Sequence, residues 1–524
     1  MIVVSILRLL AISISCLTIS AIPQFQEPIL IVVGDVNTNN ARIMYDALDR
    51  HLVHTPVQAV LSLSGEDIYS ETLIIAEKPS IWILSSLEPG QHYLIHLSSK
   101  NGISSRASFS TLSSNRDSSF KIVIASCNNF DSDHDGSFLK QLSEDENVQS
   151  RIGMMHIGDQ IYADPIFHNW NRGGRLKPFE VLLEEFRSAY RRVWSAPEMR
   201  TLLSTAANWM LLDDHDIINN LDAEHFRDGR GPLLLAGRQA LLEYQFQLHR
   251  DVFHENGTEL SQVCADFNKV ISSFAFIFVD TRFQRTFSFD GNAPMLGKAQ
   301  MHRVNTSIHR YGQDTSISRM FVVSSVPFMF APFKWFATLA DIVEGEKLTS
   351  HSVHRRETST LLDLVGKFAN KSTFLAGDVH LFLRSRICQK ATSHATSSRH
   401  CIEQIVTSGV TVASTAANQL KVCIFHFMCL FLGPRQLGSW ELVPDAVNIG
   451  HNALIVNGQS ENYEAIPIFY KSPSQWTQAS QNVFNLGFRI RAWQTNAIVL
   501  TAVSVMVTTL IYRIRRNSKR KTHN

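Results

Sequence analysis

The sequence predicts an α/β domain preceded by an all-β module, and three observations indicate this. From Phe120 onward, apolar strand-like runs alternate with helical stretches, which is typical of α/β architecture. Four of those runs end abruptly at residues able to bind metals or exchange protons. Residues 28–113, by contrast, show short stretches of period-two alternation without helical periodicity, which favours a β-sandwich.

The N-terminal residues 1–26 carry a single charge, Arg8, in an apolar run that ends in small residues at Ser20 and Ala21. This pattern predicts a cleavable signal peptide over residues 1–21, with an uncleaved anchor as the alternative. Residues 28–113 follow as the predicted sandwich. The stretch Leu87–Leu97 resembles the turn and strand of fibronectin-type modules that carry a corner tyrosine, here Tyr93. We interpret the module as a packing domain, with a ligand-binding module as the alternative.

After a polar linker at residues 113–119, the predicted α/β domain spans residues 120–460. Its expected helices cover residues 179–190, 233–249 and 358–368, and further strands are expected at 274–279, 321–325 and 402–407. The apolar segments 328–340 and 418–432 are too short to span a bilayer. We interpret them as core segments, with a membrane-facing lip as the alternative.

The four polar strand ends are the most informative feature of the chain. Their residues follow the runs 122–126, 154–157, 209–212 and 374–376, and they are Cys127, Asp159 with Tyr162, Asp213–Asp216, and Asp378 with His380. Acids placed just beyond buried strands lie where α/β folds carry their chemistry. A Gly-Asp turn alone carries little information, but four such ends together predict a metal site.

The types of side chain at the site limit which metal ions it can bind. Asp159 can bridge two cations, and a pair of cations can clamp a phosphate and activate a water. The phenol of Tyr162 and the thiolate of Cys127 favour ferric iron over calcium. The oxygen donors of Asp214, Asn219 and Asp378 suit a harder second ion.

These motifs, in this order, resemble those of PhoD-type alkaline phosphatases, which are PhoD-like metallophosphatases of the calcineurin-like metallophosphoesterase superfamily. The segments 280–282, 324–327 and 407–411, together with Gln300, are also similar to the family. The resemblance covers roughly residues 28–460. It departs at Asp216, where the family more often has glutamate.

The resemblance implies two mixed β-sheets flanked by helices, and it implies Fe3+ and Ca2+ as cofactors, with other divalent metals left open. By position, iron would be bound by Cys127, Asp159, Tyr162 and His380, and calcium by Asp159, Asp214, Asn219 and Asp378. His215 would face the phosphate and stabilise it or protonate the leaving group, and Arg282 would clamp it. Asp164 would fix the loop.

The C-terminal part predicts a membrane anchor. No charged residue occurs from Ala492 to Tyr512, and a basic tail follows. We therefore expect a juxtamembrane segment at 461–491, a transmembrane helix at 492–512 and a cytoplasmic tail at 513–524. The protein would be a single-pass type I membrane protein with its catalytic domain lumenal or extracellular. Cys388 and Cys401 are expected to form a disulfide, and Asn256, Asn305 and Asn370 are glycosylation candidates.

The resulting hypothesis is a membrane-anchored, metal-dependent phosphomonoesterase or phosphodiesterase that attacks phosphate esters, lipid-linked ones included, with a metal-bound hydroxide. One alternative is a phospholipase D-like diesterase acting on lipid or glycan-anchor phosphate. The other is a non-catalytic phosphatase-like ectodomain that binds a partner. A net charge of +2 gives no argument for nucleic acid as a partner.

Overall fold

The structure is a computed structural model that describes residues 27–470, with gaps. The gaps are residues 100–101, 132–136, 174, 223–224, 226–229, 252–264, 287–291, 331–353, 391–399, 413–434 and 449.

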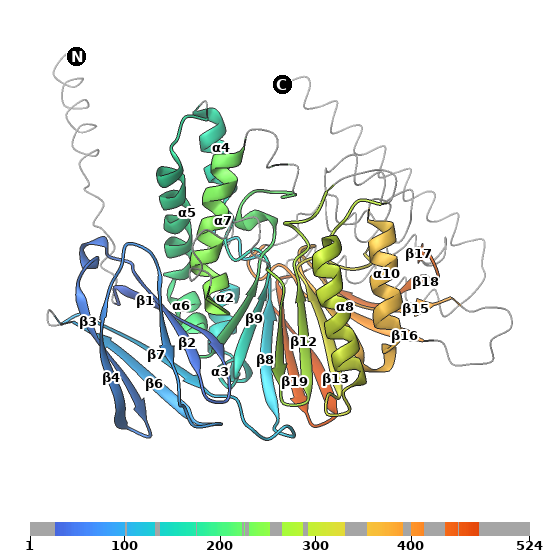
Figure 1. Ribbon diagram of the computed structural model, residues 1–524, viewed down its shortest axis with the longest axis horizontal. Helices are drawn as coiled ribbons and strands as arrows, with labels where there is room; N and C mark the ends of the chain where they lie inside the picture. Colours follow the sequence, from blue (N-terminus) through green and yellow to red (C-terminus); the bar gives the residue numbers. More distant parts are fainter. Residues whose placement is uncertain are drawn as a thin grey trace, which may run out of the picture.

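The N-terminal residues form a β-sandwich of two antiparallel sheets (Figure 1). Strands alternate buried and exposed side chains, as Val57, Ala59 and Leu61 do on the inner face of one strand. The hydroxyl of Tyr93 accepts the backbone N–H of Glu88 at 2.7 Å, which is the predicted corner interaction. One sheet has the order β1 (Ile29–Val36), β2 (Ala41–Ala47), β5 (Ser80–Leu84), and the other β4 (Glu66–Ile74), β3 (Pro56–Leu63), β6 (His92–Ser98), β7 (Ser104–Ser110).

Two mixed sheets form the centre of the α/β domain, as the resemblance implied. Within them β8, β9 and β10 run parallel, and so do β12, β13, β14 and β16, whereas the other neighbours are antiparallel. The five-stranded sheet has the order β10 (Ala207–Leu211), β9 (Gly153–Ile157), β8 (Phe120–Ala125), β19 (Asn452–Gln459), β20 (Asn462–Phe469). The eight-stranded sheet has the order β11 (Phe267–Ile271), β12 (Phe274–Val279), β13 (Arg319–Ser324), β14 (Ser372–Ala376), β16 (Cys401–Val406), β15 (Phe382–Gln389), β18 (Trp440–Asn448), β17 (Arg435–Leu437).

Helices cover the outer faces of both sheets (Figure 1). One group packs against the five-stranded sheet through a shared apolar cluster, and two helices pack in the same way against the eight-stranded sheet. The first group contains α2 (Ser137–Glu144), α3 (Glu146–Gln149), α4 (Asp164–Arg172), α5 (Phe179–Trp194), α6 (Pro197–Ser204) and α7 (Gly231–Tyr244). The second contains α8 (Gly297–Gln313) and α10 (Arg355–Gly366).

A third apolar cluster lies between the two sheets and continues into the sandwich. It joins Ile124 of β8 and Phe276 of β12 to Ile31 and Tyr93 of the sandwich. Every residue of β12 is buried because both faces of its sheet are covered.

Polar contacts also link the sandwich to the α/β domain. Asp46 of β2 pairs with Arg191 at 2.8 Å and accepts the hydroxyl of Tyr244 at 2.6 Å. Asp35 of β1 pairs with Lys269 at 2.6 Å and accepts the indole N–H of Trp209 at 2.7 Å. The two modules are therefore joined through buried ion pairs as well as through a common core.

The predicted secondary structure agrees in type with the structure, and its boundaries differ. The helix expected at 179–190 extends to Trp194 as α5. The helix expected at 233–249 ends at Tyr244 and is followed by a 3-10 turn at Phe246–Leu248. Cys388 and Cys401 lie opposite each other on β15 and β16 and form the expected disulfide, with Cα atoms 4.0 Å apart.

The prediction of a transmembrane helix is corrected. Among the residues that the structure describes, no helix is long and apolar enough to cross a membrane. The assignment as a single-pass type I protein with a lumenal or extracellular catalytic domain is therefore not supported. The expectation rested on hydropathy alone, whereas a membrane span also needs a long apolar helix to satisfy its backbone groups. Residues 492–512 themselves, the signal peptide at 1–21 and the tail at 513–524 lie outside the described residues. So do most of the apolar segments 328–340 and 418–432.

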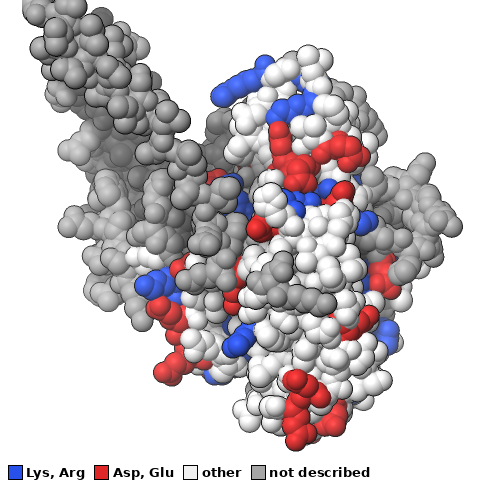
Figure 2. Space-filling model, turned by 90° about the vertical axis from the view of Figure 1, so that its left-hand side faces the viewer, with Lys and Arg blue, Asp and Glu red and all other residues white. Residues whose placement is uncertain are grey.

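Acidic and basic side chains lie interspersed on the face of the molecule shown in Figure 2. This distribution agrees with the small net charge of the chain.

Candidate metal centre

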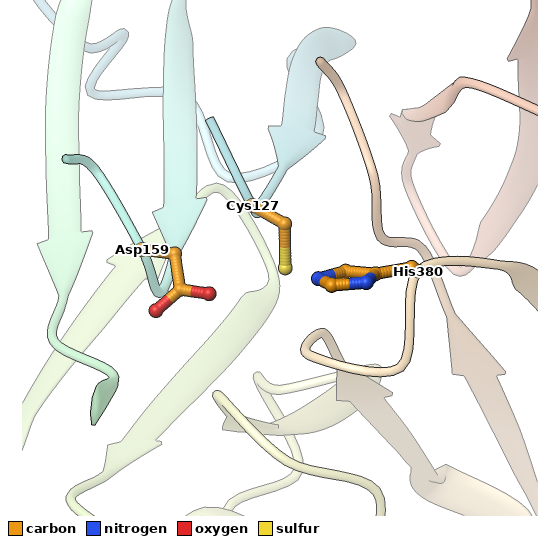
Figure 3. A group of neighbouring side chains, drawn as sticks. All are labelled: Cys127, Asp159 and His380. Atoms are coloured by element: carbon orange, nitrogen blue, oxygen red, sulfur yellow. The ribbon is translucent and has the colours of Figure 1, made fainter. Parts of the chain in front are cut away.

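The polar strand ends meet at one place in the fold. Cys127 follows β8, Asp159 follows β9 and Asp214 follows β10 in the five-stranded sheet, while Asp378 follows β14 in the eight-stranded sheet. Because neighbouring parallel strands end at the same edge, the two sheets bring these groups together. Figure 3 shows the side chains of Cys127, Asp159 and His380 pointing toward a common point.

The backbone turns sharply at the residues that supply these side chains. Cys127, Asp159, Asp378 and His380 have φ angles of 60°, 54°, 70° and 53°, in the left-handed region that non-glycine residues seldom adopt. Gly158 has φ 111°, and a Cβ there would lie 2.7 Å from the Cβ of Asp213. Such conformations cost energy and concentrate at functional sites.

The first group of candidate ligands is Cys127, Asp159 and His380, whose donor atoms all lie within 4.8 Å of one another. The hydroxyl of Tyr162 lies 3.1 Å from Oδ2 of Asp159 and 3.2 Å from Nε2 of His380. The structure thus brings together the four residues that the resemblance implied as iron ligands.

Two further groups share carboxylates with the first. Asp159, Asp214 and His215 form one group, and Asp213, Asp214 and Asp378 form the other, each within the same 4.8 Å limit. Asp159 belongs to two groups, which is the placement that a bridging ligand requires.

The electrostatics of the centre favour a cation. Burial, with the nearby carboxylate of Asp378, raises the pKa of the Cys127 thiol to about 12. Burial and the Cys127 sulfur raise the pKa of Asp159 well above its usual range, and burial does the same to the pKa of Tyr162. Bound positive charge would reverse these shifts.

Buried carboxylate oxygens in the centre also lack hydrogen bonds. Oδ2 of Asp213 has no hydrogen-bond partner, and Oδ1 of Asp214 has none beyond its ion pair with Nη2 of Arg282 at 3.2 Å. Buried polar atoms of this kind normally have a partner. The residues present therefore fit a metal centre, with sulfur, phenol and imidazole donors on one side and oxygen donors on the other.

His215 is held from two sides. Its Nδ1 lies 2.6 Å from Oδ2 of Asp164, and its ring stacks on Tyr162 with centroids 4.2 Å apart. Burial opposes a charge on the imidazole, but Asp159, Asp164 and Asp214 together outweigh it and raise the pKa of His215 to about 10. The three carboxylates therefore favour the charged form of the imidazole.

Arg282 lies deeper than a two-point phosphate clamp would require. Its side chain is fully buried, its Nε contacts Asp213, and its Nη2 lies 3.2 Å from Asp214 and 3.3 Å from Asp378. Only Nη1 has no hydrogen-bond partner. The predicted role as phosphate clamp rests on that one nitrogen.

The two tandem asparagines differ in placement. Asn219, the predicted calcium ligand, is exposed, and its backbone N–H donates to Oδ1 of Asp164 at 3.0 Å. Asn220 has a buried Oδ1 without a partner, and its N–H donates to Oδ2 of Asp214 at 2.6 Å. Asn220 is thus a second candidate that sequence reasoning missed, and its buried Oδ1 and its φ of 60° distinguish it from its neighbour.

Asp216, where the chain departs from the family pattern, organises the loops of the centre. Its carboxylate accepts the backbone N–H groups of Gln160 at 2.9 Å, Ile161 at 3.3 Å and Asp213 at 2.9 Å. It therefore joins the loop after β9 to the loop after β10, and a single carboxylate has no sequence signal for this role.

The glycosylation candidates lie in different settings. Asn370 is exposed in the 3-10 turn Ala369–Lys371. Asn305 lies within α8, with a buried Oδ1 that has no hydrogen-bond partner. Asn256 lies outside the described residues.

Comparison with known proteins adds a family and a fold. A family model described as PhoD-like phosphatase matches residues 122–427, which is more than half of the chain. A solved structure titled "Structure of PhoD" superposes with a TM-score of 0.63 at 11% identity, covering 90% of this chain and 100% of that one. At this identity the likeness concerns the fold alone.

Two further structures match only a small part of the chain. One is titled "Myokine structure" (18% identity, 16% of this chain, 95% of that one), and the other is the sensor domain of the anti-sigma factor RsgI4 in Pseudobacteroides cellulosolvens (13%, 16% and 74%). Their TM-scores are 0.14, so they carry no argument. No curated protein matches the chain.

Proposed function

The chain belongs to the PhoD-like phosphatase family, and on that premise we propose that it is a metal-dependent phosphoesterase whose reaction takes place at the centre formed by the four strand ends. The observation that carries the proposal is the convergence of Cys127, Asp159, Tyr162 and His380, with Asp159 shared by a second group.

The donor types divide the centre into two halves. Cys127, Tyr162, His380 and Asp159 would hold an iron ion, because thiolate and phenolate favour iron. Asp214, Asp378 and Asp159, with Asn219 or Asn220, would hold calcium, which prefers oxygen ligands. When bound, the metal pair supplies the positive charge that polarises a phosphate ester and lowers the pKa of a water.

The residues around the centre supply the remaining chemistry. His215 holds a proton that it can donate to the leaving alkoxide, and Asp164 keeps its ring oriented through Nδ1. Arg282 balances three carboxylates and leaves Nη1 for a phosphate oxygen. Asp216 keeps the two ligand-bearing loops in register.

The test uses the full chain purified with and without Fe3+ and Ca2+. Metal content, visible absorption from tyrosinate bound to ferric iron, and turnover of mono- and bis-(4-nitrophenyl) phosphate are measured together. We expect bound metal and turnover of at least one ester class. The ratio of the turnover rates of the mono- and the bis-ester separates a monoesterase from a diesterase. Asp159→Asn should abolish both properties.

Asp445→Asn is the matched control, because Asp445 lies in β18 and pairs with Arg386 at 2.9 Å. It should change neither property. A wild-type protein that binds no metal and turns over neither ester would refute the proposal.

A further inference from the structure

The loop Thr407–Thr411, which follows β16, wraps around Cys127. We infer that Ser408 in this loop is a positioning residue whose single hydroxyl holds two ligands of the metal centre, Cys127 and His380. The inference rests on the metal centre of the proposed function and assigns a role to a segment that so far had only a family resemblance.

Two contacts define the position of the Ser408 hydroxyl. The backbone N–H of His380 donates to Oγ of Ser408 at 2.9 Å. Oγ lies 3.0 Å from Sγ of Cys127. A serine hydroxyl has one proton and two acceptor lone pairs, so it can accept from His380 and donate to the sulfur at the same time. A thiolate bound to a metal has no proton, so in the metal-loaded centre the sulfur is the acceptor.

The other hydroxyl near the sulfur is less well placed. Oγ of Ser126 lies 3.5 Å from Sγ of Cys127, and a better acceptor for its proton, the carbonyl oxygen of Thr407, lies 3.2 Å away. Ser408 is therefore the principal donor to the sulfur among the described residues.

Ser408 is itself fixed from the opposite sheet. Its side chain is fully buried, and its backbone N–H donates to Oδ1 of Asn452 at 3.0 Å. Asn452 begins β19, which pairs with β8, the strand that leads to Cys127. The same Oδ1 also accepts the hydroxyl of Thr407 at 2.9 Å.

The backbone of the loop adds further restraint. The N–H groups of Gly409 and Val410 both donate to the carbonyl oxygen of Ser126, at 3.3 and 3.0 Å. Asn452, Ser408 and Ser126 thus form a connected set that leaves the Ser408 hydroxyl little freedom to turn away from its two partners.

Two physical consequences follow from this arrangement. The hydroxyl satisfies the N–H of His380, whose left-handed φ of 53° removes it from regular strand hydrogen bonding. It also stabilises negative charge on the Cys127 sulfur, which reduces the electron density that the thiolate gives to a metal. Loss of the hydroxyl should therefore loosen one ligand and change the electronic character of the other.

The experiment uses the full chain, stripped of metal with a chelator and titrated with Co2+ as the probe. Thiolate coordination gives a charge-transfer band, and its energy reports the hydrogen bond to sulfur. For Ser408→Ala we expect a shift of the band to lower energy and a loss of Co2+ affinity of roughly 10- to 100-fold. Ser408→Thr keeps the hydroxyl and should keep the band at the wild-type energy.

Ser385→Ala is the matched control, because Ser385 is equally buried in β15 and its hydroxyl contacts Gln404, outside the centre. It should change neither the band nor the affinity. If Ser408→Ala keeps both the wild-type band energy and the wild-type affinity, the inference is overturned.

Failure of the proposed function has a different signature. A wild-type protein that shows the cobalt–thiolate band but hydrolyses no phosphate ester would refute the phosphoesterase assignment and leave the role of Ser408 standing. A wild-type protein that binds Co2+ without the band would overturn the role of Ser408, because Cys127 would then not be a ligand.

Discussion

Both carboxylate oxygens of Asp164 accept hydrogen bonds at the edge of the metal centre. Oδ2 lies 2.6 Å from Nδ1 of His215, and Oδ1 accepts the backbone N–H of Asn219. The carboxylate therefore orients the imidazole and stabilises its charged form. Because Nδ1 is engaged, Nε2 is the ring nitrogen left for a substrate.

Replacing Asp164 with Asn should weaken proton donation by His215. Removing the negative charge of Asp164 lowers the pKa of His215, so the imidazolium is lost at lower pH. In the plot of kcat against pH, the alkaline limb should move to lower pH. For an alkyl phosphate, kcat should fall by about 100-fold. With 4-nitrophenyl phosphate the loss should be smaller, because nitrophenolate leaves without a proton. Equal losses for both leaving groups at every pH would contradict a role in proton donation.

The choice between Asn219 and Asn220 can be tested with a matched pair. Glycine at either position removes the amide and tolerates the φ of 60° found at Asn220. We expect Asn220→Gly to weaken Ca2+ binding by roughly 10-fold or more, since its buried Oδ1 has no other partner, and Asn219→Gly to leave it within about twofold. Isothermal titration of the full chain with Ca2+ measures both. The reverse order of effects would identify Asn219 as the ligand.

Lys269→Met should destabilise the junction between the sandwich and the α/β domain. It leaves the Asp35 carboxylate, whose side chain is 18% exposed, without its counterion, and breaking a largely buried pair typically costs about 3 kcal/mol in the free energy of unfolding. The double variant Asp35→Asn with Lys269→Met should recover part of that loss. Denaturant unfolding followed by circular dichroism measures these changes.

The control for this prediction is Arg386→Met. Arg386 pairs with Asp445 on the surface, with side-chain exposures of 53% and 34%, so the loss should stay within about 1 kcal/mol. Equal losses for the two variants would show that burial of the Asp35–Lys269 pair has no energetic consequence.

His249 gives the protein a pH-dependent stability. Burial lowers the pKa of His249 to about 4, and its Nε2 accepts the backbone N–H of Met210 at 3.0 Å. A depressed pKa means that this contribution is complete above about pH 6.5, the unfolded value, and is lost as the pH falls toward 4.

The variant His249→Gln keeps an acceptor and does not titrate. The stability difference between wild type and this variant should therefore shrink by about 1–2 kcal/mol between pH 7.5 and pH 5. Comparing the two proteins cancels the effect of His156, whose pKa is also lowered to about 4 by burial. A difference that stays constant with pH would contradict this linkage.

The centre was predictable where ligands follow directly from strand ends. Cys127, Asp159 and Asp378 each come just after a buried strand, so position in the chain implies position at the edge of the sheet. Ser408 and Cys127 are 281 residues apart, and their contact depends on β16 and β8 ending together, which no local pattern encodes. The choice between Asn219 and Asn220 depends on which side chain turns inward, which the sequence does not show either.

In the fold, too, features set by local sequence were predictable and features set by long-range pairing were not. Strand β12 was predicted with its observed bounds, because a continuous apolar run belongs to a strand covered on both faces. The insertion of β19 between β8 and β20 could not be predicted, since residues 452–459 return to pair with the first strand of the α/β domain.

The left-handed backbone at residues 127, 159, 378 and 380 bears on how this centre can be lost over evolutionary time. Glycine and asparagine adopt that conformation most readily, whereas β-branched residues adopt it at considerable cost. A descendant that abandons catalysis would therefore first accept Gly or Asn at these four positions, keeping the fold while losing the chemistry. Inactive relatives should be recognisable by that replacement pattern, and valine or isoleucine there should mark chains whose loops have rearranged.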